Sequence, residues 1–343
     1  MKRRLLSLLA GCAGLALAGL GTPAQAQSGS PTIDAIKGRD ALVCGTSADL
    51  PGFAVLNNRG EYSGLYTDFC RAIAAAVLGD AKKVRFVTTT YSNRLTALQS
   101  GEIDILSSNT TWTQPREAAL GLLFTGVLFY DGQGFLVSKK LGVKSIKELD
   151  GASVCVQPGT TTEKNLADFF RANNMRLNPV VIESVEEIRN AMVAGRCDAF
   201  TVGTSTLAAF RAGLGARGEE FEVLPELISK EPLGPVVRKG DDKFFDLVRW
   251  TQNAMTLAEE FGITSRNLEQ HMDDPRPDVQ RLLGASGDYG KDMGVSRDWA
   301  ANIIRQVGNY AEVWDRNVAP MGLPRGRNQL YTQGGLQYAP PIR

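Results

Sequence analysis

The stretch from Gly101 to Arg116 combines residue types that could bind an anion. It begins as a short apolar strand at Ile103–Leu106 and continues into hydroxyl and amide side chains before it reaches Pro115 and Arg116. Proline suits the first turn of a helix, where free N–H groups and the helix dipole attract negative charge. The planar guanidinium of Arg116 would add two parallel donors for a carboxylate. This motif alone leaves open the alternative of an ordinary solvated arginine on a short helix over residues 116–120.

The N-terminus has the pattern of a secretory signal peptide. Basic residues Lys2 to Arg4 precede an apolar run from Leu5 to Leu20, and Ala24-Gln25-Ala26 supplies a cleavage site. We expect residues 1–26 to be removed after Ala26 and the mature protein to be exported to the periplasm. A lipoprotein signal at Cys12 is a weaker alternative, because the apolar run continues beyond that cysteine.

The composition of the mature chain narrows the function classes. No later segment approaches the roughly 20 apolar residues that a membrane-spanning helix needs. Removal of the three basic residues of the signal peptide leaves 35 Lys and Arg against 37 Asp and Glu, a formal net charge of −2. This balance argues against a nucleic-acid partner. We therefore expect a soluble protein that is not inserted in a membrane and is long enough for two lobes.

Four cysteines remain after the signal peptide: Cys44, Cys70, Cys155 and Cys197. An even number in an oxidising compartment indicates two disulfides, for which three pairings are possible. We favour Cys44–Cys70 and Cys155–Cys197, because each bond then joins a strand to a nearby element of its own half. A zinc site is less well supported, since no Cys-x-x-Cys pair occurs and His271 is the only histidine. We expect no metal and no cofactor.

Short apolar strands alternate with amphipathic helices in two separate parts of the chain. In the first part, strands at 41–44, 84–87 and 103–106 alternate with helices at 65–78 and 92–100. In the second part, after a short helix at 145–149, strands at 154–157, 180–182 and 198–202 alternate with helices at 162–172 and 185–194. This pattern predicts an α/β fold of two lobes, each with a mostly parallel sheet flanked by helices. A ligand would bind in the cleft, at the carboxyl ends of the strands.

Two segments are expected to cross between the lobes. The first is glycine-rich and apolar and lies around residues 121–137, and the second is Ser229–Arg238, whose two prolines suit an extended edge segment. The predicted lobes are residues 27–133 with 236–343, and residues 134–235. The chain is mostly helical after Asp241, with one apolar stripe between Phe244 and Phe261 and a second between Trp299 and Trp314, both expected in the core.

Several segments together are specific enough to suggest a family. The mature chain resembles, over nearly its whole length, the periplasmic solute-binding proteins of polar amino-acid ABC transporters, bacterial solute-binding protein family 3, and among them the general L-amino-acid-binding subgroup. The segments that carry this resemblance are Leu50–Phe53, Asp68–Ile73, Asn109–Thr113, Tyr130–Gly134, Ile228–Gly234, Asp298–Trp299 and Gly335–Arg343. The resemblance implies a two-lobed, hinge-closing receptor of the type II periplasmic-binding-protein fold. It further implies a small carboxylate ligand, with an amino acid favoured, delivered to an ABC-transporter membrane permease.

The resemblance also implies a set of ligand-binding residues. Arg116 corresponds to the arginine that clamps the ligand α-carboxylate, with Thr111 in the preceding turn. Tyr91 corresponds to the aromatic residue that packs on the ligand, and the turn from Thr46 to Asp49 contributes nearby. From the second lobe, Gly159–Thr162 would present backbone N–H groups at a helix start. The complete expected set is Arg116, Thr111, Asn109, Tyr91, Asp49, Thr46, Gln157, Thr160, Thr161, Gly203 and Thr204.

The sequence departs from the family pattern at the amine half of the site. The acidic residue that usually pairs with the ligand ammonium corresponds here to Gly203, and Ser108 stands where arginine is common in this subgroup. A buried ammonium without an anionic partner lacks a strong hydrogen bond, and its desolvation is uncompensated. Three alternatives remain open: the ligand is an acid without an α-ammonium group, the amine is bound through Asp49 or another acid, or the correspondence is displaced by a residue or two.

Two other functions are weighed against a transport receptor. An exported dehydratase-like enzyme on the same fold would need a positioned titrating group, and His271 falls in the C-terminal helical part. The sensing module of a membrane receptor would be expected to continue into a membrane span. We therefore expect a monomeric binding protein and not an enzyme.

Overall fold

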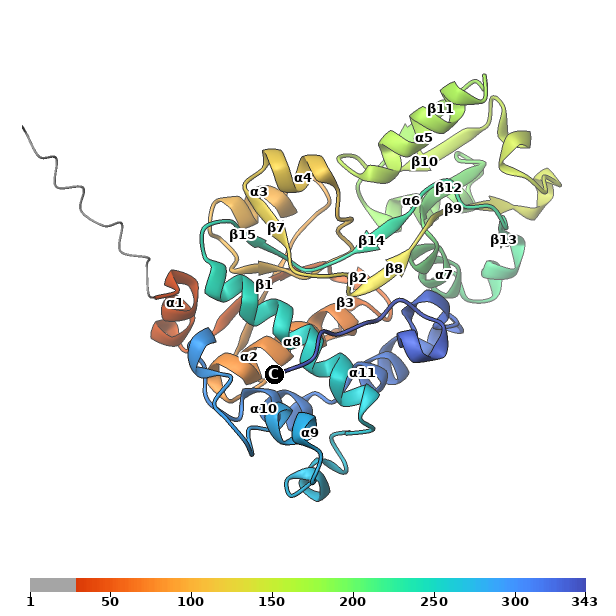
Figure 1. Cartoon of the computed structure of the whole chain (residues 1–343). Coiled ribbons are helices and arrows are strands. Elements are labelled where there is room, and N and C mark those ends of the chain that lie inside the picture. The colour runs from red at the N-terminus through yellow and green to blue at the C-terminus, as the bar shows by residue number, and fades with distance from the viewer. Residues whose placement is uncertain (1–28) are drawn as a thin grey trace, which may run out of the picture.

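The computed structural model describes residues 29–343, so the expected signal peptide at residues 1–26 lies outside the described residues. Two five-stranded sheets form the centres of two lobes (Figure 1). The first has the order β5 (Val84–Thr88), β1 (Leu42–Thr46), β6 (Ile105–Leu106), β15 (Val236–Arg238) and β7 (Leu122–Phe124). The second has the order β11 (Asn178–Val181), β10 (Ser153–Val156), β12 (Ala199–Gly203), β9 (Gln133–Ser138) and β13 (Phe221–Val223).

Both sheets are built on the same plan. In each sheet the first three strands are parallel and the last two join in antiparallel pairs. The helices of the first lobe are α1 (Pro31–Arg39), α2 (Leu65–Leu78), α3 (Arg94–Gln99) and α4 (Gln114–Ala119). Those of the second lobe are α5 (Thr161–Ala172), α6 (Val185–Val193) and α7 (Thr204–Gly213). The predicted two-lobed α/β fold is confirmed.

The two crossings pair with each other as a separate antiparallel ribbon. Strand β8 (Phe129–Asp131) leads into the second lobe, and β14 (Glu231–Leu233) leads back. The register places Asp131 opposite Glu231. Of the two prolines in the return crossing, Pro232 lies in this ribbon, but Pro235 directly precedes β15, which is an interior strand between β6 and β7. The expectation of an edge position therefore fits only Pro232; Pro235 is tolerated because it lies before the first residue of the strand.

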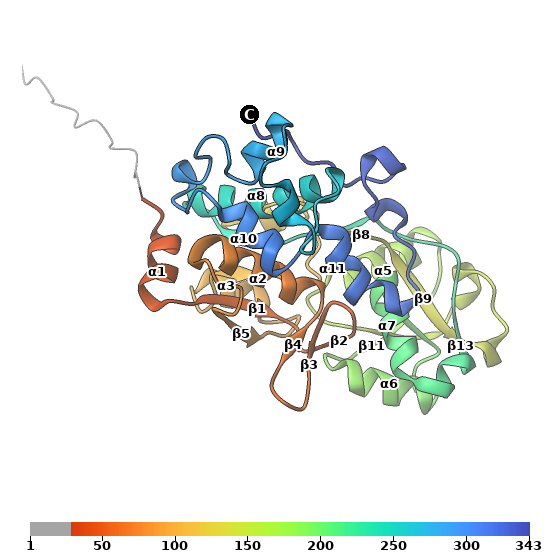
Figure 2. The same ribbon diagram turned by 90° about the horizontal axis from the view of Figure 1, so that it is seen from below.

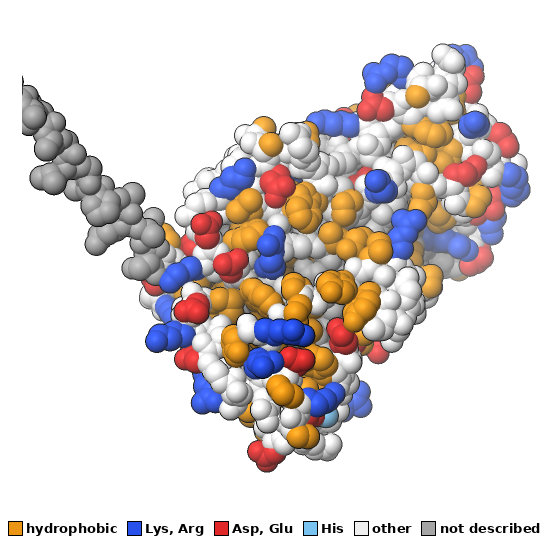
Figure 3. All heavy atoms as spheres, viewed as in Figure 1, with side chains coloured by type: hydrophobic (Ala, Val, Ile, Leu, Met, Phe, Trp, Pro, Cys, Tyr) orange, Lys and Arg blue, Asp and Glu red, His pale blue; other side chains and the backbone are white. Residues whose placement is uncertain are grey.

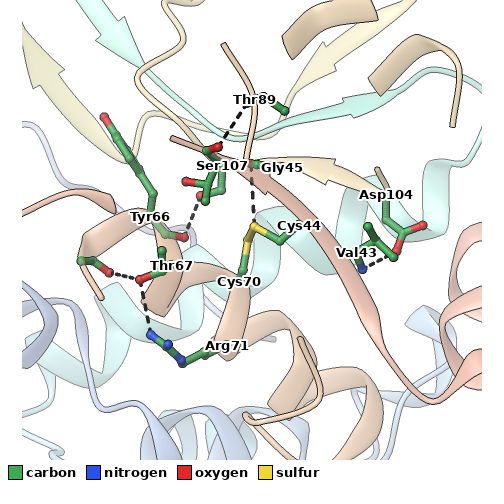
Figure 4. Close-up of a disulfide and its surroundings, with 12 residues drawn as sticks. Val43, Cys44, Gly45, Tyr66, Thr67, Cys70, Arg71, Thr89, Asp104 and Ser107 are labelled. Atoms are coloured by element: carbon green, nitrogen blue, oxygen red, sulfur yellow. Dashed lines mark hydrogen bonds between the residues drawn. A yellow bond between two sulfur atoms is a disulfide. The ribbon is translucent and has the colours of Figure 1, made fainter. Parts of the chain in front are cut away.

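Both predicted disulfides are confirmed. Cys44 of β1 bonds to Cys70 of α2 and ties this helix to the first sheet, as Figure 4 shows. Next to this bond, the hydroxyl of Ser107 donates to the carbonyl oxygen of Tyr66 at 2.9 Å. Cys155 of β10 bonds to Cys197 just before β12 in the second lobe. Each disulfide thus fixes a strand whose carboxyl end faces the cleft.

The C-terminal helices share one core with α2 in the first lobe (Figures 1 and 2). They are α8 (Asp242–Glu260), α9 (Pro277–Leu282), α10 (Trp299–Gln306) and α11 (Tyr310–Asn317). Both predicted apolar stripes are largely buried there, and the second runs over two helices, α10 and α11. The break is at Gly308, whose φ of 95° suits glycine, and Asn309 then caps α11 with a reciprocal bond to Glu312.

Shorter elements complete the described chain. A small sheet contains β2 (Asp49–Leu50), β3 (Ala54–Leu56) and β4 (Tyr62–Ser63). The short 3-10 turns are η1 (Lys139–Leu141), η2 (Ile146–Leu149), η3 (Gly215–Glu220), η4 (Leu268–His271), η5 (Lys291–Met293), η6 (Ala319–Met321), η7 (Gly326–Asn328) and η8 (Tyr331–Gln333). Among residues 29–343, no helix has both the length and the apolar character needed to cross a membrane. On the face drawn in Figure 3, acidic and basic side chains are intermixed over both lobes.

Candidate ligand-binding site between the two lobes

A cavity lies between the lobes and against the hinge ribbon. It has a volume of about 370 Å³, part of which is open to solvent. Its lining combines first-lobe, second-lobe and ribbon residues: Tyr91, Arg94, Asn109, Thr111, Asp131, Thr160, Thr161, Thr162, Val202, Gly203, Thr206, Glu231 and Leu233. The structure thus brings together six of the predicted site residues here: Tyr91, Asn109, Thr111, Thr160, Thr161 and Gly203.

The second lobe presents the start of helix α5 to this cavity. Thr160 caps the helix, because its hydroxyl accepts the backbone N–H of Glu163 at 3.1 Å. Thr161 and Thr162, the first two helical residues, also line the cavity. The free N–H groups and the positive end of the helix dipole favour an anion at this position.

The first lobe contributes two buried guanidinium groups. Arg94 at the start of α3 is 2% exposed and lines the cavity. Its Nη1 donates to the carbonyl oxygen of Tyr91 at 2.6 Å, and its Nε has no hydrogen-bond partner among residues 29–343. Burial, with a contribution from the neighbouring Arg116, lowers the pKa of Arg94 to about 10. Within the described chain, neither arginine forms an ion pair with a carboxylate. An anionic ligand would compensate for this buried positive charge.

Arg116 lies behind the cavity wall. It belongs to α4, is 8% exposed, and donates from Nη1 to the carbonyl oxygen of Thr111 at 2.8 Å. Burial lowers its pKa, and the nearby Glu231 carboxylate partly offsets this effect. Arg116 therefore supports the Thr111 turn in this arrangement, and Arg94 is the guanidinium that reaches the cavity lining.

The hinge ribbon adds two buried carboxylates that the sequence did not indicate as site residues. Glu231 is 2% exposed and accepts hydrogen bonds from Thr111, Thr161, Asn165 and Ser229. Asp131 is 8% exposed, and burial raises its pKa although hydroxyl and backbone donors partly offset this. Both acids lie in segments that carry the family resemblance, Tyr130–Gly134 and Ile228–Gly234. An acidic residue in each crossing segment is therefore the sequence signal that could have indicated them.

The remaining predicted residues do not form part of the cavity lining. Thr204 donates to Asp131 Oδ1 at 2.6 Å, and Gln157 at the end of β10 donates to the carbonyl oxygen of Glu183 at 2.9 Å. Thr46 is fully buried at the end of β1, and its hydroxyl has no hydrogen-bond partner in the described part of the chain. Asp49 lies in β2 with an exposed side chain. Outside this region, His271 Nδ1 lies 3.0 Å from Asp274 Oδ2 in the C-terminal part.

Direct contacts join the two lobes across the cavity. The hydroxyls of Thr111 and Thr161 lie 3.1 Å apart, and the backbone N–H of Ser92 donates to Glu183 at 3.2 Å. The Ser92 hydroxyl donates to the same carboxylate. These contacts require the lobes to be close together, so the structure has a closed arrangement.

A match to a family model adds to the evidence from the fold and the cavity. Residues 42–266 match the bacterial extracellular solute-binding proteins, family 3. The chain belongs to this family. The match spans both five-stranded sheets and the hinge ribbon, whereas most of the C-terminal helical part lies beyond it.

Individual members of the family are similar over most of the chain. The general L-amino acid-binding periplasmic protein AapJ of Rhizobium johnstonii is 49% identical over 100% of both chains. The glutamate/glutamine/aspartate/asparagine-binding protein BztA of Rhodobacter capsulatus is 51% identical over 91% of this chain and 93% of its own. An ABC transporter periplasmic binding protein from Brucella ovis, solved with glutathione bound, has a TM-score of 0.88 at 48% identity and covers 91% of this chain and 99% of its own.

Proposed function

We propose that this protein is the periplasmic receptor of an ABC transporter and captures an amino acid or a related small carboxylate between its lobes. It then delivers the ligand to a membrane permease. The observation that carries this proposal is the cavity itself, where the buried guanidinium of Arg94, which forms no ion pair within residues 29–343, and the start of α5 line the same space from opposite lobes. The names of the relatives support an amino acid as the first candidate.

Closure would provide the affinity. The ligand carboxylate would accept hydrogen bonds from Arg94 on one side and from the N–H groups at Thr161 and Thr162 on the other. Because these donors belong to different lobes, an anion between them favours the closed arrangement over an open one. The role is binding and release, without chemical conversion of the ligand.

The cellular setting follows from the same proposal. The signal peptide would be cleaved near Ala26, and the mature protein would work in the periplasm as a monomer. Two disulfides suit that oxidising compartment.

Titration calorimetry of ligand-free protein against L-amino acids, α-keto acids, hydroxy acids and glutathione tests this function. We expect micromolar or tighter binding of at least one carboxylate, and recovery of the bound ligand chemically unchanged by mass spectrometry. Binding of none of these acids, or conversion of the bound acid to a product, would contradict the proposal.

A further inference from the structure

The absence of a side chain at Gly203 has a specific spatial reason. The backbone there has φ −54° and ψ 141°, a conformation open to any residue, so the turn itself does not require glycine. A Cβ at this position would instead lie 2.5 Å from Oδ2 of Asp131, and 3.8 Å from Oδ1. Gly203 therefore leaves room for the Asp131 carboxylate, and Oδ2 is the oxygen turned toward that space. Both residues line the cavity between the lobes.

Asp131 is held in place by neutral donors. Oδ1 accepts the backbone N–H of Gly132 at 2.8 Å and the hydroxyl of Thr204 at 2.6 Å. Oδ2 accepts the Ser205 hydroxyl, and the backbone N–H of Ser205 lies 3.3 Å away. The carboxylate thus sits at the start of α7, where the helix dipole and these donors partly offset the burial that raises its pKa. Oδ2, with one short bond and one long one, retains capacity for another donor.

Glu231 faces the same cavity but its oxygens are already occupied. Oε2 accepts from Thr111 and Thr161, and Oε1 accepts from Asn165 and Ser229. Because Glu231 is paired with Asp131 across the hinge ribbon, two carboxylates are buried on neighbouring strands. Neighbouring like charges repel each other. Within residues 29–343, neither acid forms an ion pair.

The positive and negative charges around the cavity belong to different parts of the molecule. Arg94 and Arg116 place positive charge in the first lobe, and Asp131 and Glu231 place negative charge on the ribbon. Glu231 partly offsets the charge of Arg116, whereas within residues 29–343 Arg94 and Asp131 form no ion pair. A ligand with one anionic and one cationic group would compensate both ends, because buried charges are costly unless paired. A simple carboxylic acid would compensate only the guanidinium end.

We propose that Asp131 Oδ2, for which Gly203 leaves room, binds a protonated amine of the ligand. This contact selects zwitterions over acids that lack the amine. Asp131 can have this role only if the cleft binds a small carboxylate, as proposed above. Glu231 adds negative potential but has no free oxygen for the amine. The specificity residue therefore belongs to the hinge ribbon and not to the end of β12.

Matched pairs of ligands test this role. The probes are L-glutamate with α-ketoglutarate and L-leucine with α-ketoisocaproate, each titrated calorimetrically into wild type, Asp131→Asn and the surface control Asp273→Asn. For the pair that wild type binds, we expect Asp131→Asn to weaken amino-acid binding about 10- to 100-fold, the loss typical of a buried charged hydrogen bond. Keto-acid binding should change by less than about threefold, since no charged partner is lost. The control should behave as wild type.

Moving the carboxylate provides a second, independent test. Asp131→Ala alone should lose the preference for the amino acid, and Asp131→Ala combined with Gly203→Asp should regain most of it, because the new side chain enters the space that Asp131 occupied. An aspartate at position 203 would also cap α7, which keeps the variant folded. Full amino-acid preference in both Asp131→Asn and Asp131→Ala would overturn the role of Asp131. Wild-type protein that binds none of the wider panel of amino acids, keto acids, hydroxy acids and glutathione would instead contradict the proposed function.

Discussion

At the scale of single residues, two different arginines support the Thr111 turn and line the cavity. Arg116 donates to the backbone of the Thr111 turn, whereas Arg94 lines the cavity with an unpartnered Nε. A guanidinium buried this deeply costs stability in the ligand-free protein. The presence of this buried positive charge is consistent with a ligand whose carboxylate compensates for it.

Replacing each arginine by glutamine should separate these roles. Arg94→Gln should weaken binding of a carboxylate about 10- to 100-fold through loss of a direct charged hydrogen bond. Its stability should change little, because the lost hydrogen bond to the Tyr91 carbonyl is offset by removal of a buried cation that Arg116 repels. Arg116→Gln should weaken binding and also lower the free energy of unfolding by about 1–3 kcal/mol, because the Thr111 carbonyl loses its donor. Calorimetry and urea unfolding measure both quantities; equal stability losses in the two variants would contradict this division.

Several residue roles could be predicted because they depend on local sequence. Pro115 and Arg116 indicate a helix start, and Thr160 is a cap recognisable from the residues that follow it. Asp131 and Glu231 could not be placed in the same way. Their proximity depends on the pairing of two crossings that lie far apart in the chain, and a sequence pattern does not give that register.

At the scale of elements, the hinge strands β8 and β14 are supported by residues of the C-terminal part. Asn328 of η7 accepts the backbone N–H of Tyr130 at 2.7 Å and donates to its carbonyl oxygen at 3.1 Å. Its amide thereby pairs with β8 on the side opposite β14, as a third strand would. Tyr310 of α11 also donates to the carbonyl oxygen of Leu128, at 2.8 Å. The C-terminal part, mostly beyond the matched family segment, therefore braces the hinge.

Loss of the Asn328 amide should loosen this brace. Asn328→Ala leaves two buried backbone groups of β8 without partners, so we expect the free energy of unfolding to fall by about 1–3 kcal/mol. The matched control is Gln333→Ala, an exposed amide of the same C-terminal segment, which should have no measurable effect. Urea unfolding monitored by tryptophan fluorescence compares the two. Identical midpoints for wild type and Asn328→Ala would show that the brace does not contribute.

The element boundaries show where sequence patterns reach their limit. Helices α2, α5 and α6 match their apolar periodicity because one face of each is buried. The apolar stripe from Trp299 to Trp314 continues through Gly308, although the structure has two helices there. The left-handed conformation of that glycine breaks the helix while both halves still face the same core. Periodicity indicates the buried face and not the continuity of the backbone.

At the scale of the whole molecule, closure depends on contacts both inside and at the rim of the cleft. Inside, Glu231 of the ribbon accepts hydroxyls from Thr111 of one lobe and Thr161 of the other. At the rim, Glu183 of the second lobe accepts both the backbone N–H and the hydroxyl of Ser92. The inner contacts are shielded from water, whereas Ser92 is exposed. The rim contact should therefore affect the rate of opening more than the rate of ligand association.

Neutralising the rim carboxylate should speed ligand release without removing a residue that lines the cavity. Glu183→Gln weakens the hydrogen bonds to Ser92 that exist only when the lobes are closed, so we expect dissociation about three- to tenfold faster, corresponding to about 1 kcal/mol at an exposed position. Association should change less, because the open protein has not yet formed this contact. The control is Glu186→Gln, an exposed acid at the start of α6 three residues away. Stopped-flow fluorescence with a bound amino acid measures both rates, and equal dissociation from the two variants would mean that the rim contact does not hold the cleft closed.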